Sequence, residues 1–387
     1  MIDFSIPDET QMILETLRRF IQKELAPHEA EVEEIQYVRP ELVKELRSKA
    51  KEMGLFAMGM PEEVGGGGLS TVEMCLCEEE FGFTKDALVR RAFGAIPASL
   101  MNCVGEQREK YLLPAVRGEI NVALGMTEPN AGSDAAGIKT SAKRDGDDFI
   151  LNGSKHFISD ADVSDAFIVT AVTDPSRGAK GISAFLIDKG MKGFTVGRTQ
   201  YMMGLRGTNH SELIFEDLRL PKSQMLGPEG SGLYQALSTI NRVRLGMVGG
   251  RSVGMARKLL QKCIDYSNER KQFGQTLGEF QMVQAMLADM ATEIFATRMM
   301  VMNAAWETDK GLDPREKVSM VKYYASEMLG RVADKAVQIF GGMGYCREMP
   351  LEQLYRDARV YRIFDGASDI HRVVIARSLL KNGRQAL

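Results

Sequence analysis

The sequence predicts an α+β protein in which an N-terminal helical domain and a C-terminal four-helix bundle flank a middle antiparallel β-domain. Apolar residues recur at helical spacing up to about residue 117, at strand spacing from residue 122 to 226, and at helical spacing again from residue 230. Two tight-turn dipeptides, Asp145-Gly146 and Asn152-Gly153, both lie in the middle segment. The predicted domains are residues 1–121, 122–228 and 229–387.

The N-terminal segment carries apolar residues at helical spacing from residue 7 to about residue 117. Ser70 and Glu73 fit a capping box, which predicts that a helix begins near residue 70. Four consecutive glycines at 65–68 interrupt the pattern just before this helix. No Lys-Ser or Lys-Thr pair follows these glycines and no strand precedes them, so we predict a surface loop and not a phosphate-binding loop.

The middle segment is predicted to form β-strands. Its two turn dipeptides lie one short strand apart and predict two successive hairpins. Apolar or alternating runs follow at residues 166–173, 182–187 and 211–215, separated by turns that contain Gly and Asp. We therefore expect an antiparallel sheet.

The C-terminal segment returns to helical spacing and keeps it. Long amphipathic helices are predicted over residues 233–263, 280–294 and 318–339, with a closing helix over residues 368–380. Long antiparallel helices of this kind bury their apolar faces on one another, so we expect a four-helix bundle.

Composition argues against several classes of protein. The formal net charge is −3 and the 49 Lys and Arg residues are spread along the chain, so we expect no nucleic-acid partner. There is neither a long apolar run nor a signal-like N-terminus, so we expect a cytoplasmic protein that does not use a membrane. The 5 cysteines are scattered and the 4 histidines form no cluster, so we expect reduced, mostly buried thiols and no metal site.

The loop at residues 124–134 opens the β-segment. Pro129 and Asn130 start a turn, and Gly132 lets the backbone approach a bulky group. Such a turn presents backbone N–H groups and the Ser133 hydroxyl to a phosphate or a ring edge. Taken alone, an ordinary turn between a helix and a strand is the more common interpretation of such a loop.

Five motifs together carry a family resemblance. They are LGMTEPNAGSD (124–134), LNGSKHFISD (151–160), NERKQFGQTLGEFQ (268–281), AVQIFGGMGY (336–345) and RDARVYRIFDGASDIHR (356–372). On these motifs the chain resembles the acyl-CoA dehydrogenase family over essentially its whole length. The resemblance implies FAD-dependent oxidation of an acyl-CoA thioester to the enoyl-CoA. It also implies a homotetramer, a dimer of dimers, that passes electrons to an electron-transfer flavoprotein.

The resemblance implies which residues bind FAD. Positions that hold or flank the flavin ring are Met126, Thr127, Gly132, Ser133, Phe157, Ile158 and Ser159. Positions that reach the ADP half across a subunit interface are Arg270, Phe273, Gln281, Gln338, Gly341 and Gly342. Ala367 and Asp369 stand where relatives commonly have a hydroxyl residue and Gln, which weakens two expected FAD contacts.

The resemblance also implies the substrate site and the catalytic base. Substrate positions are Ser133, Asn241, Arg244, Phe364 and Gly366, with Asn241 replacing a family aspartate. Asp365 stands where most members carry a glutamate base, and the other family position for the base is occupied by Val243. By resemblance, the Cα proton passes to Asp365, the Cβ hydride passes to flavin N5, and the N–H of Asp365 helps hold the thioester oxygen.

The shorter carboxylate of Asp365 predicts an acyl group that is bulky at Cα, α-branched or alicyclic. Alternatives are an enoyl-CoA reductase, an oxidase, and a flavin- or thioester-binding subunit without activity. Arg90 and Arg91 could also pair with a dicarboxylyl-CoA, although a solvated helical pair is the more common situation for such residues.

Overall fold

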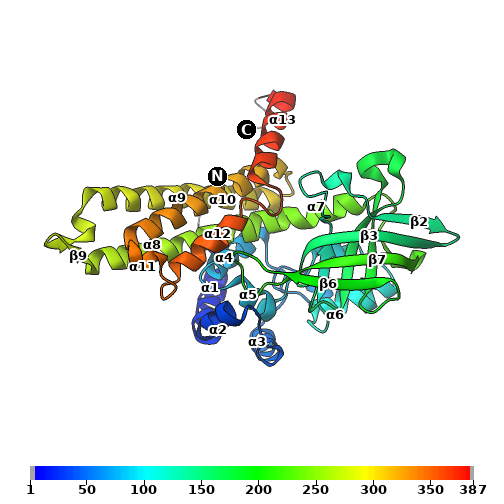
Figure 1. Cartoon of the computed structure of the whole chain (residues 1–387), viewed down its shortest axis with the longest axis horizontal. Helices are drawn as coiled ribbons and strands as arrows, with labels where there is room; N and C mark the ends of the chain where they lie inside the picture. Colours follow the sequence, from blue (N-terminus) through cyan, green and yellow to red (C-terminus); the bar gives the residue numbers. More distant parts are fainter. Residues whose placement is uncertain (1–4, 384–387) are drawn as a thin grey trace.

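The computed structural model describes residues 5–383. The molecule is elongated, with long helices at one end, a β-sheet at the other, and the N-terminal helices packed against the junction between them (Figure 1). The three predicted groups of elements are therefore present, in the predicted order. Within the described residues, no helix is long and apolar enough to cross a bilayer.

The N-terminal group is helical. Its α-helices are α1 (Asp8–Phe20), α2 (Glu29–Ile35), α3 (Pro40–Glu52), α4 (Thr71–Phe81), α5 (Asp86–Phe93) and α6 (Leu113–Val116). The predicted capping box is confirmed, because Ser70 and Glu73 satisfy each other's backbone N–H groups at the start of α4. The glycine run forms the predicted loop. A Cβ on Gly66 would lie 2.2 Å from the carbonyl oxygen of Met60, so this tight loop requires glycine there.

The middle group forms an 8-stranded sheet in the order β6-β7-β3-β2-β4-β5-β8, with β1 paired to β4. The strands are β1 (Val122–Gly125), β2 (Ser141–Asp145), β3 (Asp148–Ser159), β4 (Ala166–Val172), β5 (Ile182–Asp188), β6 (Phe194–Gln200), β7 (His210–Pro221) and β8 (Met225–Leu226). Most pairs are antiparallel, as predicted, but β1–β4 and β2–β4 are parallel. These two pairs form between distant segments, which strand periodicity does not reveal.

One of the two predicted hairpins is present. Asp145 pairs with Asp148 across the Gly146 turn, which confirms the β2–β3 hairpin. The hairpin at Asn152-Gly153 was predicted wrongly, because β3 continues through these residues and pairs with β7 across a register shift. Gly153 has φ +141, and a Cβ added to it would lie 2.7 Å from the Cα of Thr140. It therefore serves as a β-bulge and not as a turn.

The C-terminal group is the bundle. Its helices are α7 (Gly232–Val243), α8 (Arg251–Glu269), α9 (Gln281–Asp309), α10 (Arg315–Phe340), α11 (Gly342–Tyr345), α12 (Leu351–Val360) and α13 (Ser368–Asn382). The first predicted helix is helical throughout, but a π-helical segment at Arg244–Gly250 separates α7 from α8. A short hairpin of β9 (Lys271–Gln272) and β10 (Gln275–Thr276) joins α8 to α9 at the end of the bundle farthest from the sheet (Figure 1).

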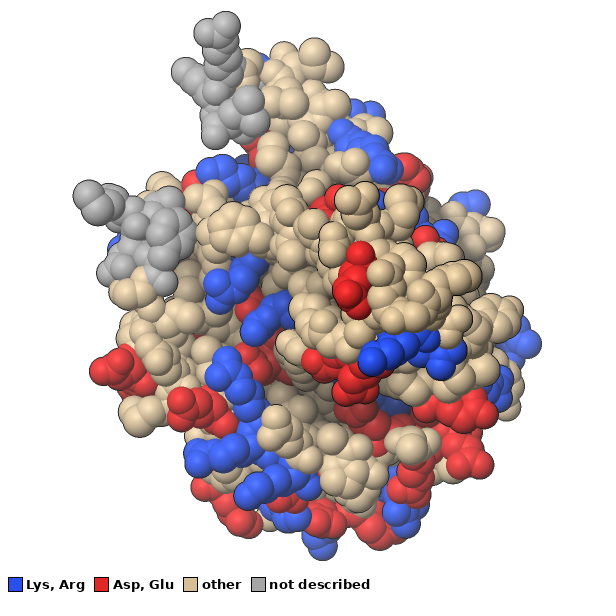
Figure 2. All heavy atoms as spheres, turned by 90° about the vertical axis from the view of Figure 1, so that its left-hand side faces the viewer, with Lys and Arg blue, Asp and Glu red and all other residues tan. Residues whose placement is uncertain are grey.

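We call this far end the bundle tip; it comprises residues 270–282 and 338–345. Figure 2 views the molecule from this end and shows a broad uncharged area, with charged side chains gathered mainly below it. Phe273, Met282 and Tyr345 are exposed by 96%, 78% and 84%. Exposed aromatic and Met side chains grouped in this way are typical of a surface that meets another molecule.

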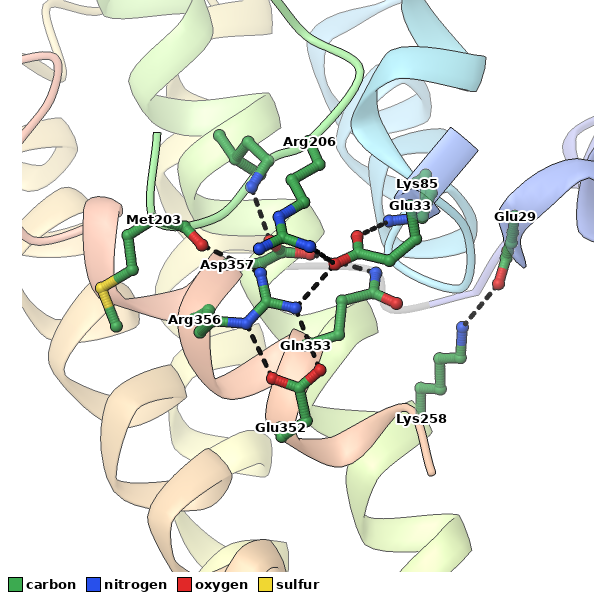
Figure 3. Close-up of polar contacts among 11 residues, drawn as sticks. Glu29, Glu33, Lys85, Met203, Arg206, Lys258, Glu352, Gln353, Arg356 and Asp357 are labelled. Carbon is green, nitrogen blue, oxygen red and sulfur yellow. Dashed lines mark hydrogen bonds and ion pairs between the residues drawn. The ribbon is translucent and has the colours of Figure 1, made fainter. Parts of the chain in front are cut away.

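A polar network ties the three groups together (Figure 3). Glu33 of α2 accepts hydrogen bonds from Lys85 at 2.6 Å and from Arg356 of α12 at 2.6 Å. Arg206, in the β6–β7 loop, lies 3.1 Å from the same carboxylate. Arg356 also donates to the Met203 carbonyl at 2.9 Å. The network fixes α12, and with it the loop that follows, against the sheet and the N-terminal helices.

The cysteines follow the prediction. Cys75, Cys77, Cys103 and Cys263 are buried free thiols, and Cys346 is exposed. Burial raises the pKa of Cys103 and Cys263 to about 12, so these thiols are unreactive near neutral pH.

Candidate active site

The loop between α12 and α13 holds Asp365 in a defined backbone conformation. Asp365 has φ +53, which non-glycine residues seldom adopt, and Gly366 has φ +93. The Asp365 carbonyl accepts a hydrogen bond from Arg244 Nε at 2.7 Å and lies 3.3 Å from Nε2 of His371. A Cβ on Gly366 would lie 2.8 Å from that histidine nitrogen, so only glycine fits between the loop and α13.

The π-helical segment presents Arg244 to this loop. π-helical turns widen a helix locally and are frequent at functional sites. Arg244 Nη1 also donates to Asn241 Oδ1, one turn earlier, at 2.8 Å. Asn241, predicted to contact substrate, is thus already engaged in orienting Arg244 toward Asp365. Phe364 packs edge-on against Tyr361 at 5.1 Å between ring centroids.

Charges from several elements surround the Asp365 carboxylate. Burial raises the pKa of Asp365, as predicted, while Arg244, Lys322 and Arg90 oppose that rise. Burial also lowers the pKa of His371 to about 4, so this imidazole is neutral near pH 7. The N–H of Asp365 donates to no acceptor in the described part of the chain, which leaves it available to a ligand oxygen.

Sequence reasoning missed Lys322, His371 and Asp160. Lys322 interrupts the apolar stripe of α10. A charged residue at such a position was the feature of the sequence that could have revealed it. His371 lies in a motif that was recognised, but its role depends on the fold of the preceding loop. Asp160 ends the second motif, and the chain alone did not reveal its arginine partners.

Those partners correct the interpretation of Arg90 and Arg91. Both were expected to be solvated; instead Arg91 is buried and Arg90 is partly buried, and each pairs with Asp160. Burial opposes ionisation of Asp160, but the two arginines outweigh it and lower the pKa of that carboxyl. The helix α5 is too enclosed by neighbouring elements to leave these side chains in water.

The predicted flavin-ring residues come together on the sheet. Thr127 accepts a hydrogen bond through its carbonyl from the N–H of His156 at 2.8 Å, and Met126 accepts one from Lys155 Nζ at 3.1 Å. These bonds hold the loop after β1 beside Phe157. The Phe157 ring is 50% exposed, and the residue has φ +58 at a bulge in β3. Ile158 is buried behind it and Ser159 is half-buried.

This surface fits a planar ring bearing polar edge groups. Gly132 and Ser133 are exposed, and a Cβ on Gly132 would meet no atom within 4 Å. Phe157 offers an exposed apolar face, and Ser133 and the loop backbone offer hydrogen-bonding groups. The donor set and the open space therefore suit a flavin ring.

The predicted ADP-binding residues lie elsewhere. Arg270, Phe273, Gln281, Gln338, Gly341 and Gly342 are all exposed and all belong to the bundle tip. The tip and the sheet lie at opposite ends of the molecule (Figure 1). One chain therefore does not bring the two predicted halves of the FAD site together.

Ala367 and Asp369, the remaining predicted FAD positions, lie at the start of α13, and Val243, the other family position for the base, lies at the end of α7. Ala367 is the residue that precedes α13 and offers no polar side-chain atom. The Asp369 side chain is 88% exposed and pairs with Arg372 at 2.7 Å. Val243 ends α7 and is unable to accept a proton.

Family models match nearly the whole chain. The acyl-CoA dehydrogenase N-terminal, middle and C-terminal domains match residues 7–119, 123–218 and 230–380. The chain is 39% identical over 381 residues to the caffeyl-CoA reductase-Etf complex subunit CarC of Acetobacterium woodii, covering 97% of this chain and 99% of that protein. It is 35% identical over 384 residues to the short-chain specific acyl-CoA dehydrogenase of Clostridium acetobutylicum, covering 98% and 100%.

Solved structures agree. Butyryl-CoA dehydrogenase from Megasphaera elsdenii superposes with a TM-score of 0.90 at 35% identity, covering 98% of this chain and 100% of that one. The FAD complex of PigA superposes with a TM-score of 0.89 at 29% identity, covering 99% and 100%. The sequence motifs, the fold and these relatives agree, and the chain belongs to the acyl-CoA dehydrogenase family of FAD-dependent oxidoreductases.

Proposed function

We propose that this protein oxidises an acyl-CoA thioester to the α,β-enoyl-CoA, with Asp365 as the base that takes the Cα proton. The observation that carries the proposal is the Asp365 carboxylate itself, on a loop fixed by Arg244 and His371 and surrounded by buried and half-buried cationic side chains. The Cα–H of a thioester is only weakly acidic, so the base must be held within reach of that proton.

Burial suits Asp365 to this task. A carboxylate removed from water is more basic than one in solution, and the pKa of Asp365 is raised by its burial. The nearby cations limit that rise, so the carboxylate is still able to ionise and accept a proton.

The peptide N–H of Asp365 supplies the second requirement of the reaction, a hydrogen-bond donor to the thioester oxygen. As the Cα proton leaves, negative charge develops on the thioester oxygen, and donors already in place stabilise it. The unpaired N–H of Asp365 is such a donor. Arg244 and His371 hold the carbonyl of the same residue and so restrict rotation of the loop backbone.

Met126, Thr127, Ser133, Phe157 and Ser159 would hold the flavin ring against the sheet, and the bundle tip of a second subunit would hold the ADP half. Bound FAD supplies the acceptor for the hydrogen that leaves Cβ with its electron pair. Proton loss to Asp365 and hydride loss from Cβ together form the new C=C bond.

The acyl group is proposed to be bulky at Cα. The aspartate is one methylene shorter than the usual glutamate, a retraction of about 1.5 Å, and a misplacement near 1 Å costs about 100-fold in rate. An α-branched or alicyclic group would fill the vacated space. A dicarboxylyl group is less well supported, because Arg90 and Arg91 already share a counter-ion in Asp160.

Reduction of an enoyl-CoA is the second candidate function. The relative from Acetobacterium woodii is a subunit of a caffeyl-CoA reductase-Etf complex. The same residues serve that direction, with Asp365 as the acid that returns a proton to Cα. An electron-transfer flavoprotein is the proposed redox partner in either direction, and a tetramer, a dimer of dimers, is the proposed assembly.

The test is anaerobic mixing of the FAD-loaded protein with straight-chain, α-branched, alicyclic and dicarboxylyl thioesters, with the flavin absorbance followed over time. An acyl-CoA dehydrogenase loses the yellow colour of oxidised flavin, fastest with the thioester it prefers. Persistence of the colour with every thioester would contradict dehydrogenation. Re-oxidation of the dithionite-reduced protein by enoyl-CoAs measures the reductase direction in the same apparatus, and oxygen consumption tests the oxidase alternative.

Asp365→Glu tests the acyl-group proposal separately. The longer carboxylate should raise the rate with straight-chain thioesters relative to α-branched ones. An unchanged order of preference would show that the shorter base does not select the acyl group.

A further inference from the structure

Lys322 is a buried cation with no hydrogen-bonding partner. It lies on α10 with 0% of its side chain exposed, and its Nζ meets no acceptor in the part of the chain that the structure describes. An unpaired ammonium group is unfavourable in a buried position, so such a residue needs a compensating negative charge nearby.

The packing of α10 places Lys322 beside the Asp365 loop. One turn further along the same helix face, Ser326 Oγ lies 3.5 Å from Ser368 Oγ at the start of α13. One residue earlier, Val321 packs so tightly on the π-helical segment that a Cβ on Gly249 would lie 2.7 Å from it. The stretch of α10 that carries Lys322 therefore lies between the π-helical segment that begins at Arg244 and the start of α13, which follows the Asp365 loop.

The other charged groups near Asp365 have hydrogen-bonding partners of their own. Arg90 pairs with Asp160. Arg244 donates to two neutral oxygens, the Asp365 carbonyl and Asn241 Oδ1, so its charge also acts on the Asp365 carboxylate. On α10 itself, Glu327 lies 3.3 Å from Arg362 and 4.0 Å from Arg372.

His371, on α13, is neutral near pH 7. Among the described cations near Asp365, Lys322 is thus the one whose charged group makes no hydrogen bond. The electrostatics agree with the geometry: burial lowers the pKa of Lys322 to about 8, while the Asp365 carboxylate opposes that fall.

We propose that Lys322 is a positioning residue whose ammonium group, together with the Arg244 guanidinium, keeps the Asp365 carboxylate ionised in its half-buried site. The inference deepens the proposed function, which makes Asp365 the base. A base partly removed from water, with too little positive charge nearby, would be largely protonated at the pH where it has to accept a proton. Lys322 does not touch the reacting atoms; it sets the pH range over which Asp365 is able to act.

The direct test titrates Asp365 in the FAD-loaded protein without substrate. The carboxyl C=O infrared band that disappears in Asp365→Asn reports its protonation. Lys322→Met should move the midpoint of this titration upward by about one pH unit or more, because an opposite charge nearby typically lowers a carboxyl pKa by 1–3 units. Lys322→Arg, which keeps the charge, should restore most of the shift. An unchanged midpoint in Lys322→Met would overturn the inference.

Lys317→Met is the matched control. Lys317 lies on the same helix and pairs with Glu307, and it is not among the charges that act on Asp365. Its replacement removes the same charge and should leave the Asp365 titration unchanged.

A reciprocal measurement covers the case in which Lys322→Met does not fold. Two coupled groups shift each other's titration, so Asp365→Asn should lower the pKa of Lys322, followed by NMR of lysine labelled at Cε. No change there would also overturn the inference.

The kinetic readout separates the two proposals. In Lys322→Met, the acidic limb of the pH profile for flavin reduction by the preferred thioester should move upward together with the infrared titration. If the carboxyl titration moves and no thioester reduces the flavin of the unaltered protein, the proposed function fails while the role of Lys322 stands.

Discussion

The surroundings of Asp365, made up of Asp365, Gly366, Arg244, Lys322 and His371 and called the pocket below, belong to the same helical bundle as the bundle tip. The two regions differ in how their polar groups are satisfied. In the pocket, the Asp365 carbonyl is held by Arg244 and His371. At the tip, Phe273 is 96% exposed, and the side chain of Arg270 makes no hydrogen bond or ion pair among residues 5–383.

The difference shows which of the two predicted sites a single chain is able to complete. The pocket is preorganised, because Arg244 and His371 of the same chain already hold the backbone of the Asp365 loop. The tip presents aromatic and cationic groups to water, an arrangement that folding alone does not favour and that a second molecule would satisfy. Variants of the pocket should therefore affect chemistry, and variants of the tip should affect binding and assembly.

The largest expected effect is in the pocket. Asp365→Asn should slow flavin reduction by about 100- to 10,000-fold, the usual contribution of a general base, because the amide does not accept the Cα proton. FAD content and thioester binding should be kept, measured by absorbance and by equilibrium titration. Asp147→Asn, in the exposed turn of the β2–β3 hairpin, serves as the control. A wild-type reduction rate in Asp365→Asn would place the base elsewhere.

At the tip, Arg270→Ala should weaken FAD binding by about 10- to 100-fold, since hydrogen bonds to charged groups contribute about 1.5–3 kcal/mol. Flavin content and assembly should fall together, measured by the FAD-to-protein ratio of each species in sedimentation velocity. Arg144→Ala, an exposed arginine of β2, should change neither. Full flavin occupancy in an isolated monomer would contradict the proposal that the tip completes a neighbour's site.

Gly366→Ala tests how tightly the pocket is packed. The new Cβ would lie 2.8 Å from His371 Nε2 and 3.1 Å from Arg244, and φ +93 adds backbone strain. We expect a loss of about 1–3 kcal/mol in the free energy of unfolding and slower flavin reduction, measured by urea denaturation and stopped flow. Gly311→Ala has a similar φ of +69 with open space around it, so it measures strain without the clash. Equal losses in the two variants would show that the clash is relieved at no cost.

The smallest expected effect on activity comes from His371, whose replacement should change mainly the pH dependence of stability. Unfolded His371 binds a proton below about pH 6.5, while burial lowers the pKa of the folded histidine to about 4. The unfolded state therefore binds more protons as the pH falls through this range, so stability falls toward pH 4. His371→Gln should flatten that dependence by about 1–3 kcal/mol, measured as urea midpoints between pH 7 and pH 5. Parallel curves for the variant and the wild type would mean that His371 is accessible to protons in the folded state.

The amino-acid sequence determined the class of the fold and most of the named positions. Helical and strand periodicity gave the order of helices, sheet and bundle, and Ser70 with Glu73 marked the start of α4, because amphipathic spacing and capping are local properties of the chain. Five motifs located Asp365, the β-domain loop and the bundle tip.

Only the tertiary structure decided which of these residues meet. The parallel β1–β4 pair, the bulge at Gly153, the π-helical turn that directs Arg244, and the pairing of Arg90 and Arg91 with Asp160 all depend on segments far apart in the chain. Lys322 is the clearest case: in the sequence it only interrupts an apolar stripe, and its function depends on a carboxylate 43 residues later that folding brings close. Burial and electrostatic coupling are properties of the packed molecule, so a local pattern does not encode them.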